Sequence, residues 1–328
     1  MLIEGMNLQV KIMHVDAVSI VVPVYKSTES VRELCDGLSS VLPSACNNFE
    51  VLLVDDGNSS DVSTFLDALV PDFVFVKVIH LSKNFGQHNA ILAGVNEAKY
   101  PVVVTMDDDL QHSPCDVPAM LAAMESHIDI VYGVPVEQPH GWIRGVLSRT
   151  VKRIISDTSS AKHIGYHSAF RAFRRSLIPT GDNIRQPSVN IDQILSWASN
   201  RVTKVEVVHN QRKYGESNYT SSRLVKHAIY LILNFTTWPL RLSSLLGMLS
   251  CGVSLLILVY VVVQRLLTGA TVPGFAFLAS SVSFFGGIQL LSIGVIGEYI
   301  SQIFTRTSDQ PTFSIRSIVN TDLRPSEG

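Results

Sequence analysis

The sequence predicts an α/β protein with a doubly wound, mostly parallel sheet, followed by a hairpin of two transmembrane helices. In the first half, short apolar runs rich in β-branched residues alternate with amphipathic stretches. Polar clusters follow the ends of several of these runs. Hydrophobic residues make up 46% of the chain and charged residues only 16%, against about 25% charged in an average soluble domain. The apolar excess lies after Leu242, which predicts the membrane part.

Five apolar runs are expected to form strands. They are Val18–Val24, Glu50–Val54, Val74–Leu81, Val102–Met106 and Asp129–Tyr132. Amphipathic patterns predict helices over Glu29–Leu42 and Gln87–Ala98. Strands that are apolar throughout and alternate with helices are typical of a parallel sheet covered on both faces.

Polar residues follow three of these strands. Tyr25, Asp56 and the triplet Asp107–Asp109 each come just after a strand's carboxyl end. Ligands bind at this edge of open α/β sheets because the loops there diverge. The three clusters together predict a ligand site at one edge of the sheet.

The acidic triplet has the residues of a divalent cation site. Asp107 and Asp109 are two residues apart and can converge on one Mg²⁺ or Mn²⁺ if the strand end bends. Such an ion bridges phosphate oxygens and neutralises a departing diphosphate. Loop acids that contact only solvent are the alternative. The second strand-end acid, Asp56, favours the metal site.

Two uncharged runs predict transmembrane helices, at about 242–263 and about 275–297. Roughly twenty residues are enough to cross a bilayer core. Lysines and arginines flank the pair on its outer sides, which places both flanks and the α/β domain in the cytoplasm. A buried hairpin of a soluble protein is the alternative.

Composition argues against other classes. The net charge is −2, so no electrostatic footprint suggests a nucleic-acid partner. The four cysteines lie far apart without a Cys-x-x-Cys pair, and we interpret them as reduced structural thiols. Residues 1–18 contain no long apolar core, so we do not expect a secretory signal peptide.

Four motifs of the first half, in order, resemble those of family 2 glycosyltransferases with a GT-A fold. They are Val22-Pro23-Val24-Tyr25, Val54-Asp55-Asp56-Gly57, Leu81-Ser82-Lys83-Asn84-Phe85-Gly86 and Asp107–Gln111. Within that family the second half is similar to the polyprenyl-phosphate glycosyltransferases. The motifs are Phe170–Arg175, Tyr214–Tyr219, Pro239–Arg241 and Gly297–Ile300. The similarity covers about 18–316, and the undecaprenyl-phosphate 4-deoxy-4-formamido-L-arabinose transferases look nearest.

The resemblance implies inverting transfer of a sugar from a nucleotide-sugar, preferably UDP-linked, to undecaprenyl or another polyprenyl phosphate. The reaction would take place at the cytoplasmic face of the bacterial inner membrane and supply envelope glycan or lipid A modification. The resemblance implies that the nucleotide-sugar is bound by Pro23, Tyr25, Asp56, Lys83, Asp107 and Gln111. It also implies that Asp107 and Asp109 bind the metal ion and that Arg144 and Ser148 contact the acceptor phosphate. Relatives also suggest a homo-oligomer, a tetramer.

Three further residues have open alternatives. Arg212 and Ser217 lie at the Gly-Glu-Ser-Asn-Tyr loop and are expected to contact the acceptor phosphate. For the arginine, contact with lipid headgroups is the alternative. Asp192, on a predicted helix, is a candidate base or sugar-hydroxyl partner, or else an ordinary helix-surface acid. Asn58 also departs from the family pattern, because relatives more often have Ser after the Asp-Asp-Gly motif.

These features divide the chain into four expected parts. Residues 1–222 form the cytoplasmic GT-A catalytic domain, and 223–241 form helices at the membrane surface. Residues 242–304 contain the two spans, and 305–328 form a cytoplasmic tail. For 223–241, an ordinary core helix is the alternative.

Two other functions remain open at this point. A processive polysaccharide synthase would conduct a growing polymer, but two spans are too few to enclose a channel alone, and the sequence has no Gln-x-x-Arg-Trp motif. A non-enzymatic membrane scaffold is the other alternative. Failure to bind a nucleoside diphosphate would favour the scaffold.

Overall fold

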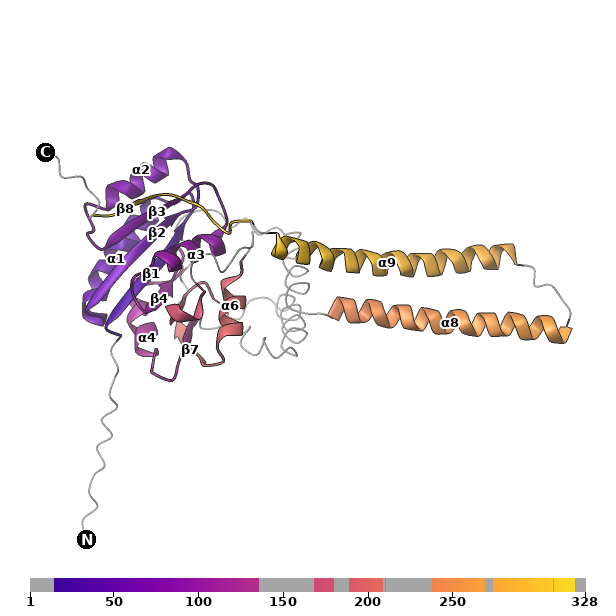
Figure 1. Cartoon of the computed structure of the whole chain (residues 1–328). Helices are drawn as coiled ribbons and strands as arrows, with labels where there is room; N and C mark the ends of the chain where they lie inside the picture. Colours follow the sequence, from indigo (N-terminus) through magenta and orange to yellow (C-terminus); the bar gives the residue numbers. More distant parts are fainter. Residues whose placement is uncertain are drawn as a thin grey trace, which may run out of the picture. The chain divides into compact units, whose positions relative to one another are not determined.

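The computed structural model describes residues 15–135, 168–179, 189–208, 210, 238–268, 274–308 and 310–321. The chain divides into two compact units. One is built around an eight-stranded sheet, and the other contains two long helices (Figure 1).

The sheet has the strand order β7-β5-β6-β4-β1-β2-β3-β8. Its strands are β1 (Ala17–Val24), β2 (Asn48–Asp55), β3 (Val76–Leu81), β4 (Val102–Thr105), β5 (Ile130–Pro135), β6 (Arg171–Arg174), β7 (Val202–Val207) and β8 (Ile315–Val319). The central strands β4, β1, β2 and β3 run parallel, whereas β6 is antiparallel to β4 and β5. Each of the five predicted strands is present, with ends that agree with the prediction or differ from it by at most three residues.

The register of the central strands brings their carboxyl ends to one edge. Val24 of β1 lies opposite Asp55 of β2, and Val21 lies opposite Thr105 of β4. The residues that follow the three strands therefore leave the sheet side by side. This is the edge at which the sequence predicts a ligand site.

Helices cover the two faces of the sheet. They are α1 (Glu29–Ala45), α2 (Ser60–Leu69), α3 (Gln87–Glu97), α4 (Val117–Ala122) and α6 (Ile191–Ala198). The core on one face contains side chains of α1, α2 and α4, and the core on the other contains those of α3 and α6. Side chains of β1 alternate between them, with Ile20 and Val22 on the first face and Val21 on the second. This arrangement confirms the doubly wound α/β fold.

The α3 helix packs very closely on the sheet. A Cβ atom at Gly94 would lie 2.4 Å from Val21 Cγ1, so the site excludes even an alanine without a shift. The close contact therefore holds the second half of α3, a helix that begins at Gln87 after Gly86, against β1 and β2.

The last strand belongs to the same sheet as the first. β8 follows the two long helices in sequence, yet it pairs antiparallel with β3 at the edge of the sheet. It covers an edge that would otherwise present unpaired backbone groups. Sequence analysis assigned 305–328 to a tail and did not predict this strand.

The second unit contains α8 (Trp238–Thr268) and α9 (Phe275–Thr307), which contact each other. Candidate spans lie at Pro239–Gln264 and Phe284–Thr305, with mean hydropathies of 2.5 and 1.3 and no buried residues in the most apolar windows. By length and composition both helices are able to cross a membrane. The division of the chain into four parts stays a prediction, and residues 223–237 lie outside the described residues.

Candidate active site

A cavity of about 340 Å³ lies at the carboxyl edge of the sheet. Residues that follow β1, β2, β3 and β4 contribute to its wall. The lining residues are Pro23, Val24, Tyr25, Asp56, Asn84, Gly86, Gln87, Asp107, Asp108 and Asp109. Five of the predicted site residues therefore share one cavity: Pro23, Tyr25, Asp56, Asp107 and Asp109.

The loop after β1 forms one side of the cavity. The Tyr25 side chain is exposed, and its backbone N–H donates to Asp108 Oδ2 at 3.3 Å. The next residue, Lys26, has a φ of +64°, in the left-handed region that residues with a Cβ seldom adopt. Its N–H donates to Asn58 Oδ1 at 2.7 Å. Hydrogen bonds on both sides thus hold the loop.

Asp56 fixes the loop after β3. Its carboxylate is buried and accepts the N–H groups of Phe85 at 2.7 Å and Gly86 at 3.0 Å. Burial raises the pKa of Asp56, and these two bonds oppose the rise. At Gly57, where φ is +67°, a Cβ would lie 2.3 Å from Asn84 N. Only glycine lets the two loops approach this closely.

The acidic triplet turns sharply after β4. Leu110 has a φ of +59°, in the left-handed region, so the backbone turns directly after Asp109. Asp107 Oδ1 accepts a hydrogen bond from Gln87 Nε2 at 2.6 Å, and Asp109 Oδ1 accepts one from the Gln111 N–H at 3.1 Å. Burial raises the pKa of Asp108, and the neighbouring charge of Asp109 adds to the rise. A cation in the cavity would relieve this repulsion.

The donor set fits a divalent cation that is shared with a substrate. Within the described residues, no three His, Cys, Asp or Glu side chains converge on one point. Asp107 and Asp109 would therefore supply two carboxylates, and water and phosphate oxygens would complete the coordination. Mg²⁺ is commonly bound in this way, through one or two carboxylates plus substrate phosphates. Carboxylate oxygens suit Mn²⁺ equally.

The other predicted residues lie apart from the cavity wall or outside the described residues. Lys83 is exposed, with Nζ 5.1 Å from the Phe85 ring centroid. Gln111 is half-buried, and its backbone carbonyl accepts from the Asn210 N–H at 3.0 Å. The four residues expected at the acceptor phosphate lie outside the described residues: Arg144, Ser148, Arg212 and Ser217.

Asp192 forms an ion pair behind the acidic triplet. It lies in the first turn of α6, where its Oδ1 accepts hydrogen bonds from Arg171 of β6 and from the Tyr132 hydroxyl, the latter at 3.3 Å. Arg171 is 1% exposed and also donates to Thr105 Oγ1 at 3.1 Å. Thr105 ends β4, two residues before Asp107. The pair therefore supports the strand that leads into the acidic triplet.

Sequence analysis missed several residues of this site. Asn84 and Gln87 line the cavity, and Asp108 binds the loop after β1. A signal for Asn84 and Gln87 was present, since both lie within two residues of Gly86, where a predicted strand leads into a predicted helix. Nothing in the local pattern indicated the partner of Asp192.

Comparison with known proteins gives the family. Residues 19–180 match glycosyl transferase family 2. Undecaprenyl-phosphate 4-deoxy-4-formamido-L-arabinose transferase of Serratia proteamaculans (strain 568) is 31% identical over 307 residues, which cover 92% of this chain and 94% of the relative. The enzyme of the same name from Enterobacter sp. (strain 638) is 31% identical over 313 residues, with coverages of 94% and 96%. The chain belongs to glycosyl transferase family 2.

A solved structure agrees with this assignment. Glucosyl-3-phosphoglycerate synthase from Mycobacterium tuberculosis, in complex with Mn²⁺, uridine diphosphate and phosphoglyceric acid, has a TM-score of 0.50 and 14% identity, with coverage of 66% of this chain and 76% of that chain. At this identity the likeness concerns the fold alone. The family 2 resemblance, its GT-A fold and the expected similarity to formamido-arabinose transferases are confirmed.

The Arg171–Asp192 pair of this family 2 glycosyltransferase gives a testable prediction. Asp192→Ala leaves the buried Arg171 guanidinium without its carboxylate, which costs about 3–5 kcal/mol in comparable pairs. We expect the thermal unfolding midpoint to fall by roughly 6 °C or more. Asp61→Ala is the matched control, because Asp61 is an exposed acid in the first turn of α2.

The double variant Arg171→Met/Asp192→Leu is expected to recover much of that loss, since no buried charge remains unpaired. Differential scanning fluorimetry of the detergent-solubilised full-length chain measures all four proteins. If Asp192→Ala has the unfolding midpoint of the wild type but loses transferase activity, the structural role is contradicted and the role of a base is favoured.

Proposed function

We propose that this chain transfers a sugar from a nucleoside-diphosphate sugar, with UDP as the first candidate for the nucleotide, to undecaprenyl phosphate. The product is a lipid-linked sugar for envelope glycan or lipid A modification. The observation that carries the proposal is the pairing of Asp107 and Asp109 on the cavity wall in a chain 31% identical to enzymes named undecaprenyl-phosphate transferases. The cavity volume lies within the range of small-ligand pockets, about 300–1,000 Å³.

The two carboxylates are proposed to hold Mg²⁺ or Mn²⁺. When bound, the ion supplies positive charge to the leaving diphosphate. Support comes from the fit of the donor set described above and from the Mn²⁺ and uridine diphosphate bound in the structure of similar fold. Gln87 orients Asp107 through its 2.6 Å hydrogen bond, and the Gln111 N–H orients Asp109.

The proposed reaction is a single in-line displacement. An oxygen of the acceptor phosphate attacks the anomeric carbon, the bond from that carbon to the diphosphate breaks, and the nucleoside diphosphate leaves with the electron pair. The configuration at carbon is inverted. A phosphate monoester has a second pKa of about 6, so its oxygens are largely ionised at neutral pH. The scheme therefore needs no general base. Asp192 has a structural role in it, as the ion-pair partner of Arg171.

The acceptor phosphate is assigned in this proposal to Arg144 and Ser148, with Arg212 and Ser217. If the two lie on a helix, a spacing of four residues would put both on one face, where both could contact one phosphate. Burying a polyprenyl chain in lipid gains about 0.8 kcal/mol per CH₂, which keeps the acceptor in the bilayer. We infer that α8 and α9 hold the catalytic domain at the cytoplasmic face of the bacterial inner membrane. A tetramer stays a prediction.

Transfer is tested with purified full-length protein, undecaprenyl phosphate, Mn²⁺ and radiolabelled UDP-, GDP- or dTDP-sugars. One label is expected to enter the lipid phase. Asp109→Asn should lower its rate about 100-fold or more, because the cation loses a ligand. The control is Asp72→Asn, whose half-exposed carboxylate pairs with Arg32 at the surface.

Wild-type rates in Asp109→Asn at saturating Mn²⁺ would contradict the metal scheme. Label found in a polymer would favour a processive synthase. Label that stays in the aqueous phase with every donor would contradict the lipid acceptor.

Arg144→Ala separates the acceptor site from the nucleotide site. Loss of a guanidinium that binds phosphate should raise the KM for undecaprenyl phosphate about tenfold or more, while the Kd for the nucleoside diphosphate stays within about twofold. Steady-state kinetics at varied lipid, with calorimetry for the nucleotide, makes the comparison. Equal loss of both affinities would place Arg144 outside a dedicated acceptor site.

A further inference from the structure

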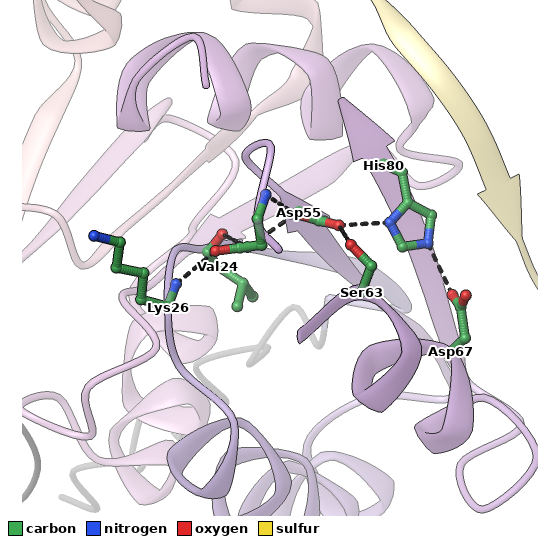
Figure 2. Close-up of polar contacts among 7 residues, drawn as sticks. Val24, Lys26, Asp55, Ser63, Asp67 and His80 are labelled. Carbon is green, nitrogen blue, oxygen red and sulfur yellow. Dashed lines mark hydrogen bonds and ion pairs between the residues drawn. The ribbon is translucent and has the colours of Figure 1, made fainter. Parts of the chain in front are cut away.

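A chain of hydrogen-bonded polar side chains extends from α2 to the loop that follows β1 (Figure 2). At its centre is His80 of β3, which is 2% exposed. Its Nδ1 lies 2.6 Å from Asp55 Oδ2, and its Nε2 lies 2.8 Å from Asp67 Oδ1. Asp55 Oδ2 also accepts the hydroxyl of Ser63 at 2.6 Å. These contacts join the end of β2 to β3 and to α2.

The chemistry of the contacts fixes the charges. A carboxylate only accepts hydrogen bonds, so an imidazole with a carboxylate at each nitrogen carries both protons. The hydrogen bond to Asp55 raises the pKa of His80, burial opposes the rise, and Asp67 adds to it. Burial would raise the pKa of Asp55, but hydrogen bonds from His80, Ser63 and Asn58 lower it to about 2. The contacts are therefore charge-assisted, the stronger class of hydrogen bond.

Asn58 connects this group to the loop after β1. Its Nδ2 donates to Asp55 Oδ1 at 2.8 Å and to the Val24 carbonyl at 2.9 Å. Its Oδ1 accepts the Lys26 N–H at 2.7 Å. Val24 and Lys26 are the two neighbours of Tyr25, so one amide side chain holds the backbone on both sides of that residue.

The loop has a conformation that needs such support. Lys26 has a φ of +64°, and residues with a Cβ keep such angles where the surroundings enforce them. Val24 and Tyr25 both line the cavity. The Tyr25 N–H is held by Asp108 from within the cavity wall, and Asn58 holds the loop from outside it.

We propose that Asp67, His80, Asp55 and Asn58 form a positioning network that holds the Val24–Lys26 loop in the conformation that binds the nucleotide. In the part of the chain that the structure describes, none of the four lines the cavity, so they act through Val24 and Tyr25. The inference rests on the proposed function, since it takes this cavity to be the nucleotide site.

Asn58→Ala tests the network because Asn58 is half-buried at its end and leaves the contacts of His80 intact. The Kd of the full-length chain is measured by calorimetry with Mn²⁺ and whichever of UDP, GDP and dTDP binds the wild type. We expect the Kd to rise about tenfold or more, because the variant loses all three hydrogen bonds of the Asn58 side chain and one such bond alone is worth up to about tenfold, with an unfolding midpoint within roughly 3 °C of the wild type. Asn58→Ser should recover part of the affinity, because a hydroxyl both donates and accepts.

The matched control is Asn47→Ala, at an exposed asparagine just before β2. If the wild type binds a nucleotide and Asn58→Ala binds it equally well, the inference is overturned while the proposed function stands. If the wild type binds none of the three nucleotides, the proposed function fails and the inference fails with it.

A second variant covers the case in which Asn58→Ala unfolds at a much lower temperature. Asp67→Asn keeps an acceptor oxygen for His80 but removes one charge, at the end of the network where the side chain is 42% exposed. Weaker nucleotide binding at an unchanged unfolding midpoint supports the network. Unchanged binding overturns it.

Discussion

Five aspartates collect at one edge of the sheet, and the surrounding structure depends on how their charges are offset. The parallel register of β1, β2 and β4 brings Asp55, Asp56 and Asp107–Asp109 to the same edge. Carboxylates this close repel one another, most strongly where water is excluded. Each is therefore bound by donors, and most of those donors belong to the loops of the cavity.

The same hydrogen bonds shape the binding site. Asp56 holds the loop after β3 through two backbone N–H groups, and Asp108 holds the loop after β1 through one. Asp55 lies away from the cavity but reaches the loop after β1 through Asn58. Asp107 and Asp109 keep their place on the wall, where a cation and a diphosphate are proposed to bind. The hydrogen bonds that offset the repulsion between these carboxylates therefore also hold the loops around the proposed substrate.

Local sequence patterns predicted the parts of the molecule that depend on local structure. The apolar runs gave the central strands, and the strand-end rule brought Tyr25, Asp56, Asp107 and Asp109 to one edge. The strands β6, β7 and β8 were not predicted, because their pairing depends on partners far away in the sequence. Contacts between residues far apart in the sequence could not be predicted for the same reason. The sequence around Asp192 does not indicate its ion pair with Arg171, and Asn58 was noted only as a departure from the family pattern. Lys83 matched a family motif, yet its side chain is exposed and does not line the cavity.

The helical hairpin is inserted between parts of one domain. The chain leaves the sheet unit, forms α8 and α9, and then adds β8 to the same sheet. If both helices cross a membrane, the chain returns to the side from which it started, as the flanking cations also predict. Family membership and the fold are established by the comparisons. The lipid acceptor, the cation and the nucleotide belong to the proposed function.

The most direct test of the account is the effect of a divalent cation on nucleoside diphosphate binding. Calorimetry compares UDP, GDP and dTDP titrated into the full-length protein with Mn²⁺ and with excess chelator. The acidic cavity predicts that at least one nucleotide binds with Mn²⁺ and that removing the ion weakens binding about 100-fold or more, because phosphate would then face the aspartates without a bridging charge. Equal affinity with and without the ion would contradict the account.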